Sequence, residues 1–196
     1  MATFSESAVV QKMVRADLAV SVLVNRACHR EYIRRFFTAV SRLGDGILWY
    51  MIMALLPFLY GVSGLVTTVY MLLSGVIALV VYKLIKQHTE RARPFAVTSK
   101  ILRGTAPLDE YSFPSGHTLH AVVFTLTACS AHPELAPALV PFALCVAASR
   151  VVLGLHFLTD VIAGAAIAVA IVYLLAPIGV ELRGSLPLVD AAFQSF

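Results

Sequence analysis

The longest uncharged stretch of the sequence, residues 47–82, is too long for one membrane-spanning helix and suits two short ones. A helix needs about 20 residues to cross a bilayer core roughly 30 Å thick, and this stretch has 36. Gly61 and Gly64 stand near its middle with a neighbouring proline and serine, a composition typical of a break between helices. We therefore predict spans at about 46–60 and 64–82.

The same pattern predicts three further spans after a polar loop. Residues 83–117 carry many charges and are expected to lie outside the hydrocarbon. Almost uncharged segments follow at 118–130, 136–152 and 161–180, with a short polar break at 131–135. With five spans, the polar loop, the segment before the first span and the junction after the fourth span all lie on one side of the membrane.

The first 45 residues are not expected to span the membrane. Basic residues alternate here with Val, Leu, Ile and Phe, which is typical of amphipathic helices lying in the membrane interface. No repeat or linker divides the chain, so we expect one all-α integral membrane domain over residues 1–196. Its expected parts are the interfacial helices (1–45), a bundle of five or six transmembrane helices (46–180) with the loop 83–117, and a tail (181–196).

Composition supports this fold class. The chain is 59% hydrophobic and only 13% charged, with a mean hydropathy of +0.84. A soluble domain of ordinary composition has about 25% charged residues, so a soluble monomer and a disordered chain are both excluded. The formal net charge of +4 favours anionic lipid over nucleic acid as a partner of so apolar a chain. The sequence leaves the oligomeric state open.

Three polar clusters, far apart in the sequence, are brought to one membrane face by this topology. The first lies at the start of the loop, the second closes the loop, and the third brackets the junction between the fourth and fifth spans. Their members are Lys86, Arg93 and Pro94; Pro114, Ser115, Gly116 and His117; and Ser149, Arg150, His156 and Asp160.

The cations of these clusters suit a tetrahedral anion. Arg93 and Arg150 offer planar forks that match phosphate oxygens, and Lys86 adds a third positive charge. Ser115 can cap a helix whose first N–H groups would also point at an anion. Each cation taken alone is more often a helix-end residue reaching for water, and the tetrapeptide taken alone is an ordinary helix start. Their convergence favours the anion site.

Two histidines suggest divided labour in a phosphoryl transfer. His156 and Asp160 are four residues apart, so on a helix they would share a face and hydrogen-bond, which leaves one ring nitrogen as nucleophile or base. His117 would donate a proton to the leaving oxygen. A structural His–Asp pair is the plain alternative. No metal is expected, because no cluster with ligand spacing is visible. The remaining histidines, His29, His88, His120 and His132, are interpreted as interfacial or incidental.

Taken together, the clusters resemble the three signature motifs of the type 2 phosphatidic acid phosphatase superfamily. All eleven fixed positions of Lys86-x6-Arg93-Pro94, Pro114-Ser115-Gly116-His117 and Ser149-Arg150-x5-His156-x3-Asp160 match, in the right order. The superfamily includes membrane lipid phosphatases, polyprenyl pyrophosphate phosphatases, soluble acid phosphatases and vanadium haloperoxidases. Many of its membrane members have six spans, whereas the hydrophobic pattern here gives five.

The resemblance implies a role for each matching position. His156 would be the nucleophile that forms a phosphohistidine, oriented by Asp160, and His117 the general acid. Residues that would bind the phosphoryl group are Lys86, Arg93, Ser115, Gly116 and Arg150. The resemblance leaves structural roles to Pro94, Pro114 and Ser149, and it implies no cofactor.

The function expected from the sequence is a metal-independent membrane phosphatase acting on a lipid phosphate monoester or a lipid pyrophosphate. A lipid-to-lipid phosphotransferase using the same site is the alternative, and a non-catalytic scaffold or channel is a third. The sequence does not distinguish phosphatidic acid, phosphatidylglycerophosphate, undecaprenyl pyrophosphate and phosphorylated lipid A as substrates.

We expect the protein to be an integral membrane protein. The family resemblance favours the bacterial inner (plasma) membrane. Eleven basic residues outside the three clusters lie on the motif side and only Arg183 on the other, a bias that favours a cytoplasmic active site. Many bacterial members of the family face the periplasm, and a sixth span would invert the topology. Both orientations therefore stay open.

Overall fold

The computed structural model describes residues 8–184, and no strand forms within that range. The tail predicted at 181–196 lies mostly outside the described residues. The α-helices are α1 (Ala8–Asn25), α2 (Glu31–Arg42), α3 (Leu48–Thr89), α4 (Pro94–Val97), α5 (Gly116–Ala131), α6 (Ala136–Val152) and α7 (Leu158–Gly184). Short 3-10 helices lie at Arg26–His29 and Pro133–Leu135, and a π-helical turn lies at Leu43–Ile47. The all-α prediction is confirmed.

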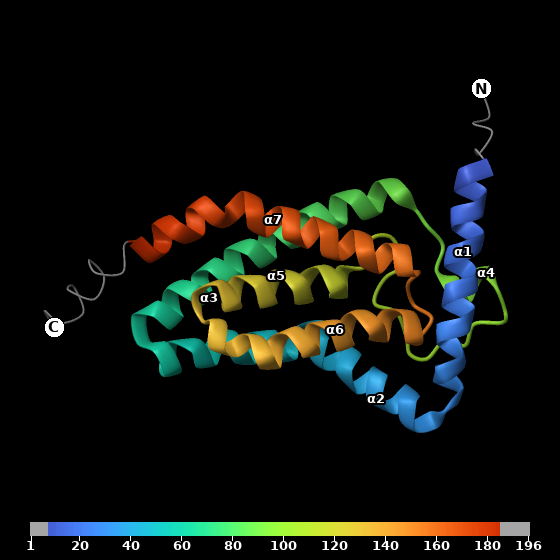
Figure 1. Ribbon diagram of the computed structural model, residues 1–196, viewed down its shortest axis with the longest axis horizontal. Coiled ribbons are helices and arrows are strands. Elements are labelled where there is room, and N and C mark those ends of the chain that lie inside the picture. Colours follow the sequence, from blue (N-terminus) through green and yellow to red (C-terminus); the bar gives the residue numbers. More distant parts are fainter. Residues whose placement is uncertain (1–7, 185–196) are drawn as a thin grey trace, which may run out of the picture.

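The predicted break in the long apolar stretch is confirmed at Gly61. This residue has φ 57° and ψ −133°, so α3 folds back on itself there and forms a hairpin of two antiparallel helices (Figure 1). The approach of the two arms is close at Gly64, where an added Cβ would lie 2.0 Å from the Leu56 carbonyl oxygen. Across the turn, Thr68 Oγ1 donates a hydrogen bond of 2.8 Å to the Met53 carbonyl. Gly61 is required for its backbone angles, and Gly64 is required because the space beside it admits no side chain.

Helix α5 is the centre of the bundle, with α3, α6 and α7 packed around it (Figure 1). Its Leu119 and Val123 are fully buried. Trp49, at the start of α3, is also fully buried, with its ring between Phe124 of α5 and Phe142 of α6 at centroid distances of 5.5 and 5.7 Å. This aromatic cluster joins three helices just beneath the polar end of the bundle.

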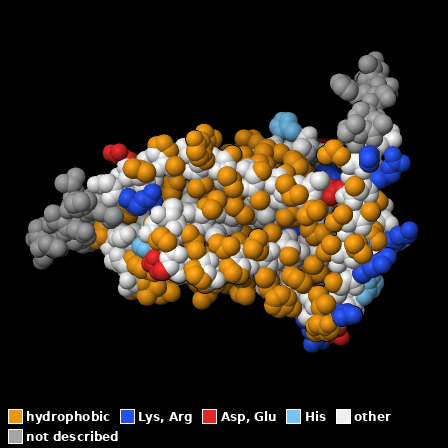
Figure 2. All heavy atoms as spheres, viewed as in Figure 1, with side chains coloured by type: hydrophobic (Ala, Val, Ile, Leu, Met, Phe, Trp, Pro, Cys, Tyr) orange, Lys and Arg blue, Asp and Glu red, His pale blue; other side chains and the backbone are white. Residues whose placement is uncertain are grey.

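The flanks of the bundle are apolar. Large hydrophobic side chains such as Phe58, Tyr173 and Leu174 are 73–87% exposed, and Figure 2 shows hydrophobic atoms over the whole length of the visible flank. Among the described residues, three helical stretches are long and apolar enough to cross a membrane: Glu31–Val97, Pro133–Val152 and Leu158–Gly184. Only 22% of the most apolar window of the last is buried, so most of it faces lipid. The fold is that of an all-α membrane protein.

Helix α5 is shorter than the other bundle helices. Its 16 residues measure about 24 Å at 1.5 Å per residue, less than a bilayer core. The helix is enclosed by its neighbours, so its length is set by packing and not by lipid. A total of five spans stays a prediction.

The N-terminal segment lies across one end of the bundle. Helix α1 runs across that end in Figure 1, and Lys and Arg side chains gather beside it in Figure 2. Asn25, the last residue of α1, fixes it there: its Nδ2 donates to the carbonyls of Leu102 (2.9 Å) and Val152 (2.8 Å). The Leu102 N–H donates back to Asn25 Oδ1 at 2.7 Å. A buried amide with three partners therefore ties α1, the polar loop and α6 together.

The α3 hairpin makes the first prediction. Gly64→Ala places a Cβ against the Leu56 carbonyl and forces the two arms apart, so we expect a loss of stability of about 1–3 kcal/mol or more. Thermal unfolding in detergent, followed by circular dichroism, measures it. Gly184→Ala is the matched control, because no atom lies within 4 Å of the added Cβ there. Equal melting temperatures for the two variants would contradict the close packing at Gly64.

Candidate active site

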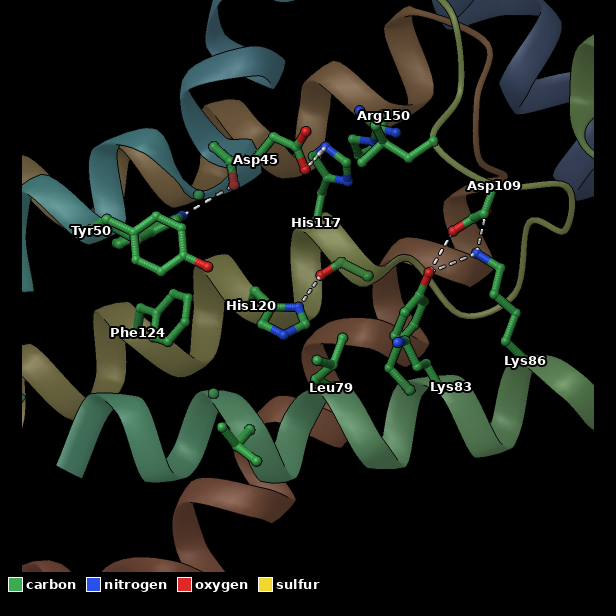
Figure 3. Close-up of a pocket in the computed structure, with 18 of the residues that line it drawn as sticks. Asp45, Tyr50, Leu79, Lys83, Lys86, Asp109, His117, His120, Phe124 and Arg150 are labelled. Carbon is green, nitrogen blue, oxygen red and sulfur yellow. Dashed lines mark hydrogen bonds and ion pairs between the residues drawn. The ribbon is translucent and has the colours of Figure 1, made fainter. Parts of the chain in front are cut away.

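A cavity of about 490 Å³ opens at the polar end of the bundle and gathers residues from all three sequence clusters (Figure 3). Lys86 comes from the last turn of α3, Arg93 precedes α4, and Arg150 is near the end of α6. The members of the clusters that line the cavity are Lys86, Arg93, Gly116, His117, Arg150 and His156. The convergence predicted from topology therefore occurs in the structure.

Arg93 is buried and held at both ends of its guanidinium group. Its Nη1 donates to the Leu155 carbonyl at 2.6 Å and lies 3.3 Å from His156 Nε2. Its Nε donates to the Asp109 carbonyl at 3.1 Å, and its Nη2 to the Asp109 carboxylate at 2.5 Å. The fork is thus positioned beside the histidine before any ligand binds.

Asp109 is a site residue that the sequence did not reveal. Its carboxylate accepts hydrogen bonds from Lys86 Nζ at 2.6 Å, from Arg93 Nη2 and from the Tyr82 hydroxyl (Figure 3). Burial opposes its ionisation, but the hydrogen bonds from Lys86 and Tyr82 and the charge of Arg93 outweigh burial and lower the pKa of Asp109 to about 2. One carboxylate therefore contacts two of the three cations, and its single negative charge offsets only one of them. In the sequence, Asp109 looked like any other charge of the polar loop.

Arg150 is buried and keeps an unused donor. Its Nη1 donates to Ser41 Oγ of α2 at 2.5 Å. Its Nε has no hydrogen-bond partner within the described part of the chain, although it is fully buried. A buried unpaired N–H is costly, and it belongs to a guanidinium group that lines the cavity.

The predicted helical pairing of His156 with Asp160 is wrong in its geometry. Helix α7 begins at Leu158, so His156 lies in the junction before it and shares no helix face with Asp160. His156 Nδ1 instead donates to the Ser112 carbonyl at 2.6 Å, and the Asp160 carboxylate lies 3.7 Å away. Because Nδ1 carries the proton that it donates in this hydrogen bond, Nε2 is the nitrogen with the free lone pair, and it faces Arg93.

His156 is neutral in this setting. Burial lowers its pKa well below the ordinary value, and the charges of Arg150, Arg93 and Lys86 lower it further. The imidazole is 2% exposed, which shields it from water. A neutral, oriented imidazole is the form that can act as a nucleophile.

Asp160 is held by an ion-pair network that reaches α1. Arg91 Nη1 donates to Asp160 at 2.5 Å and Arg91 Nη2 to Asp17 of α1 at 2.7 Å. Asp17 also accepts the Thr159 N–H at 3.2 Å. The Arg91 guanidinium lies 4.1 Å from the centre of the Phe157 ring. This network could not be predicted from the sequence, because its members come from three distant segments.

The second cluster forms the start of α5 and differs in detail from the prediction. Ser115 occupies the N-cap position, but its hydroxyl contacts Thr118 Oγ1 at 3.0 Å and caps no backbone N–H. Ser115 is fully buried, and its N–H donates to the Asp160 carbonyl at 3.0 Å. His117 lines the cavity, with Nε2 at 3.4 Å from Asp45. Ser115 and Asp160 thus lie behind the cavity wall and support it.

The remaining motif residues have structural positions. Pro94 is the first residue of α4, where a missing N–H costs nothing. Pro114 follows a cis peptide bond just before α5. Ser149 donates from Oγ to the Val146 carbonyl at 2.6 Å within α6.

Two of the histidines interpreted as interfacial or incidental make specific contacts. His120 lines the cavity, and its Nδ1 donates to the Gly116 carbonyl at 2.9 Å. His132, after α5, is 5% exposed, stacks on Tyr60 at 3.9 Å and contacts Thr67 Oγ1 at 3.1 Å. As for metals, no group of three or more His, Cys, Asp or Glu within residues 8–184 could hold an ion.

The fold and the site agree with one family. The PAP2 superfamily model matches residues 63–183, more than half of the chain, and the chain belongs to this superfamily.

Two solved structures are similar to the chain. One is the transmembrane PAP2-type phosphatidylglycerolphosphate phosphatase from Bacillus subtilis, at 24% identity and a TM-score of 0.64, with 87% of each chain covered. The other is LpxE from Aquifex aeolicus, at 22% identity and a TM-score of 0.68, with 85% of this chain and 94% of that one covered. These likenesses show the shared fold. No curated protein sequence matches the chain.

The Arg91 network makes the second prediction. Arg91→Ala leaves the buried carboxylates of Asp17 and Asp160 unpaired, so we expect a loss of about 3 kcal/mol at neutral pH and a melting temperature lower by several degrees. Arg35→Ala, which removes the exposed ion pair with Glu31, is the control and should change little. Equal melting temperatures for the two variants would show that the network contributes no stability.

Proposed function

We propose that the protein is a membrane phosphatase that removes the phosphate of a lipid phosphate ester through a phosphohistidine on His156. The observation that carries the proposal is the neutral His156, whose Nε2 lies 3.3 Å from Arg93 in a cavity with two further cations. A nucleophile beside preorganised positive charge is what phosphoryl transfer requires.

The first half-reaction uses the residues as follows. His156 Nε2 attacks phosphorus, and the bond from phosphorus to the lipid oxygen breaks. Arg93, Arg150 and Lys86 stabilise the charge on the phosphoryl oxygens, with the unpaired Arg150 Nε as one donor. His117 gives its proton to the lipid oxygen, which leaves as an alcohol. In the ligand-free site, an N–H of Arg93 faces His156 Nε2. When substrate binds, this N–H donates to the phosphate instead, which frees the lone pair of His156 for the attack.

The second half-reaction returns the enzyme to its starting state. Water attacks the phosphohistidine and gives a proton to His117, which now acts as a base. The bond between phosphorus and His156 breaks, and inorganic phosphate leaves. No step calls for a metal, because the side chains supply the positive charge.

The cavity wall supports a lipid as the substrate. Leu72, Val76 and Leu79, spaced along one face of the second arm of α3, line the cavity below its charged end. They are also 39–59% exposed on the apolar flank, so the cavity opens toward the surface that faces lipid. A phosphorylated headgroup could reach the cations while its chains stay in the bilayer.

The similar structures narrow the substrate class but not the substrate. One acts, by its name, on a phosphatidylglycerolphosphate. A lipid carrying a terminal phosphate fits the cavity of this chain on the same chemistry. Phosphate release from a panel of phosphatidic acid, phosphatidylglycerophosphate, undecaprenyl pyrophosphate and phosphorylated lipid A, with a chelator present, identifies the preferred one.

The nucleophile makes the third prediction. His156→Ala should lower phosphate release from the preferred lipid by several orders of magnitude and leave the melting temperature within a few degrees of wild type. The purified wild-type protein should release phosphate without an added acceptor lipid, which separates a phosphatase from a phosphotransferase. His29→Ala is the control, because His29 is exposed and lies outside the cavity. Retained turnover in His156→Ala would overturn the proposed mechanism.

The apolar wall makes the fourth prediction. Leu79→Trp narrows the lipid-facing part of the cavity, so we expect KM for a long-chain lipid phosphate to rise about tenfold or more, from the loss of some 1.4 kcal/mol of binding. Hydrolysis of 4-nitrophenyl phosphate, which has no chain, should change little. Leu84→Trp, at an exposed position of the same helix that does not line the cavity, is the control. An equal loss on both substrates would show that the chain does not bind here.

A further inference from the structure

The turn between α2 and α3 directs an acidic side chain into the cavity. Within the π-helical turn Leu43–Ile47, Asp45 (φ −83°, ψ 25°) and Gly46 (φ 118°) leave helical geometry, and the chain kinks. Gly44 fixes the kink against α6, because an added Cβ would lie 2.6 Å from a Val146 methyl group. Asp45 lines the cavity as a result, and Figure 3 shows its carboxylate pointing at His117.

Asp45 and His117 lie within ion-pairing distance, and the contact becomes an ion pair when the imidazole is protonated. Asp45 Oδ1 lies 3.4 Å from His117 Nε2, slightly longer than a hydrogen bond. Contacts of this kind are often long in ligand-free enzymes and tighten when substrate binds. The His117 side chain is 11% exposed and that of Asp45 is 40% exposed, so the carboxylate approaches the imidazole from the open side of the cavity.

Asp45 is the carboxylate available to His117. The charged and titratable groups around His117 come from every element packed against it: Asp45 from the kink, His120 from α5, Lys83 and Lys86 from α3, Asp109 from the loop, Arg150 from α6 and His156 from the junction. Burial most of all, and then Arg150, His156 and His120, lower the pKa of His117, while the charge of Asp109 raises it. Asp109 is bound to two of the cations, whereas Asp45 is the carboxylate in direct contact with the His117 imidazole.

We propose that Asp45 is the positioning residue of the general acid, orienting the His117 ring and stabilising its protonated form. This inference rests on the proposed function. Asp45 accepts from Nε2–H, and the other ring nitrogen carries the proton that goes to the lipid oxygen as the bond to phosphorus breaks. His117 is then neutral, and the proton that it takes from the attacking water restores the ion pair with Asp45. No proton is gained or lost over the cycle beyond those of substrate, water and product.

The inference extends the site beyond the segment that defines the family. The superfamily model begins at residue 63, whereas Asp45 precedes it. Ser41, one turn earlier on α2, holds Arg150 Nη1 at 2.5 Å. The end of α2 and the kink thus contact two of the cavity's functional side chains, and Gly44, between Ser41 and Asp45, packs closely against Val146 of α6.

The test is the pH profile of Asp45→Asn, measured as kcat/KM on the preferred lipid phosphate. A general acid must be protonated, so activity falls at high pH as the acid loses its proton. Without the carboxylate, that fall should begin about one pH unit lower or more, and kcat at neutral pH should drop about 10- to 100-fold. Asp45→Glu should restore part of the rate and move the profile back.

A second substrate separates acid catalysis from a merely structural effect. The 4-nitrophenolate of 4-nitrophenyl phosphate leaves without needing a proton, so Asp45→Asn should slow its hydrolysis far less than that of the lipid. Glu31→Gln, which removes an exposed carboxylate from α2, is the matched control and should leave both substrates and the profile unchanged.

The outcomes are distinct. Two results would overturn the role of Asp45 while leaving the phosphatase proposal in place. One is a fall of kcat/KM at high pH that occurs at the same pH in Asp45→Asn as in wild type. The other is an equal loss of rate on both substrates. Loss of the proposed function itself would appear elsewhere, as turnover retained in His156→Ala. A fall shifted to lower pH together with a selective loss on the lipid would support Asp45 as the partner of His117.

Discussion

The rest of the structure depends on three cations that are buried at one end of an apolar bundle and need compensating partners. Arg93 and Arg150 are each 2% exposed and Lys86 is 8% exposed, in a molecule whose flanks face lipid. Removing such charges from water costs several kcal/mol each unless partners compensate. The protein compensates incompletely: Asp109 brings one negative charge to both Lys86 and Arg93, while Arg150 has a serine hydroxyl and, within the described residues, one N–H without a partner. The positive charge that remains uncompensated favours the binding of an anion in the cavity.

The carboxylates around the cavity divide into those that hold the scaffold and those that face the cavity. Asp17 and Asp160 are almost completely buried and share Arg91, so they anchor α1 and the start of α7 behind the junction that carries His156. Asp109 and Asp45 line the cavity, each on an irregular segment. The first pair therefore holds the backbone around the nucleophile, and the second pair places negative charge beside the cations and His117.

The sequence was sufficient for the features that follow from hydrophobic pattern and topology. The break near Gly61 and the gathering of Lys86, Arg93, His117, Arg150 and His156 both needed only span lengths and the alternation of sides. The hydrogen-bond partners within the site could not be predicted from the sequence. A four-residue spacing predicts a shared helix face only if both residues are helical, and His156 lies just before α7 begins. The carbonyl that orients His156 belongs to Ser112, 44 positions earlier, and a backbone acceptor leaves no mark in the sequence.

The hairpin of α3 explains why an N-terminal residue can serve a site whose motifs lie far downstream. Because the chain reverses at Gly61, the start of the first arm and the later part of the second arm lie at the same end of the bundle. The kink that carries Asp45 precedes the first arm, and Tyr82 and Lys86 lie on the second (Figure 3). Trp49, packed between α5 and α6, holds the start of the first arm against these two helices. Its Nε1 donates to the Gly44 carbonyl at 3.2 Å. One indole thus joins the apolar core to the kink that directs Asp45 toward His117, so the depth of hydrophobic packing sets the position of a carboxylate in the cavity.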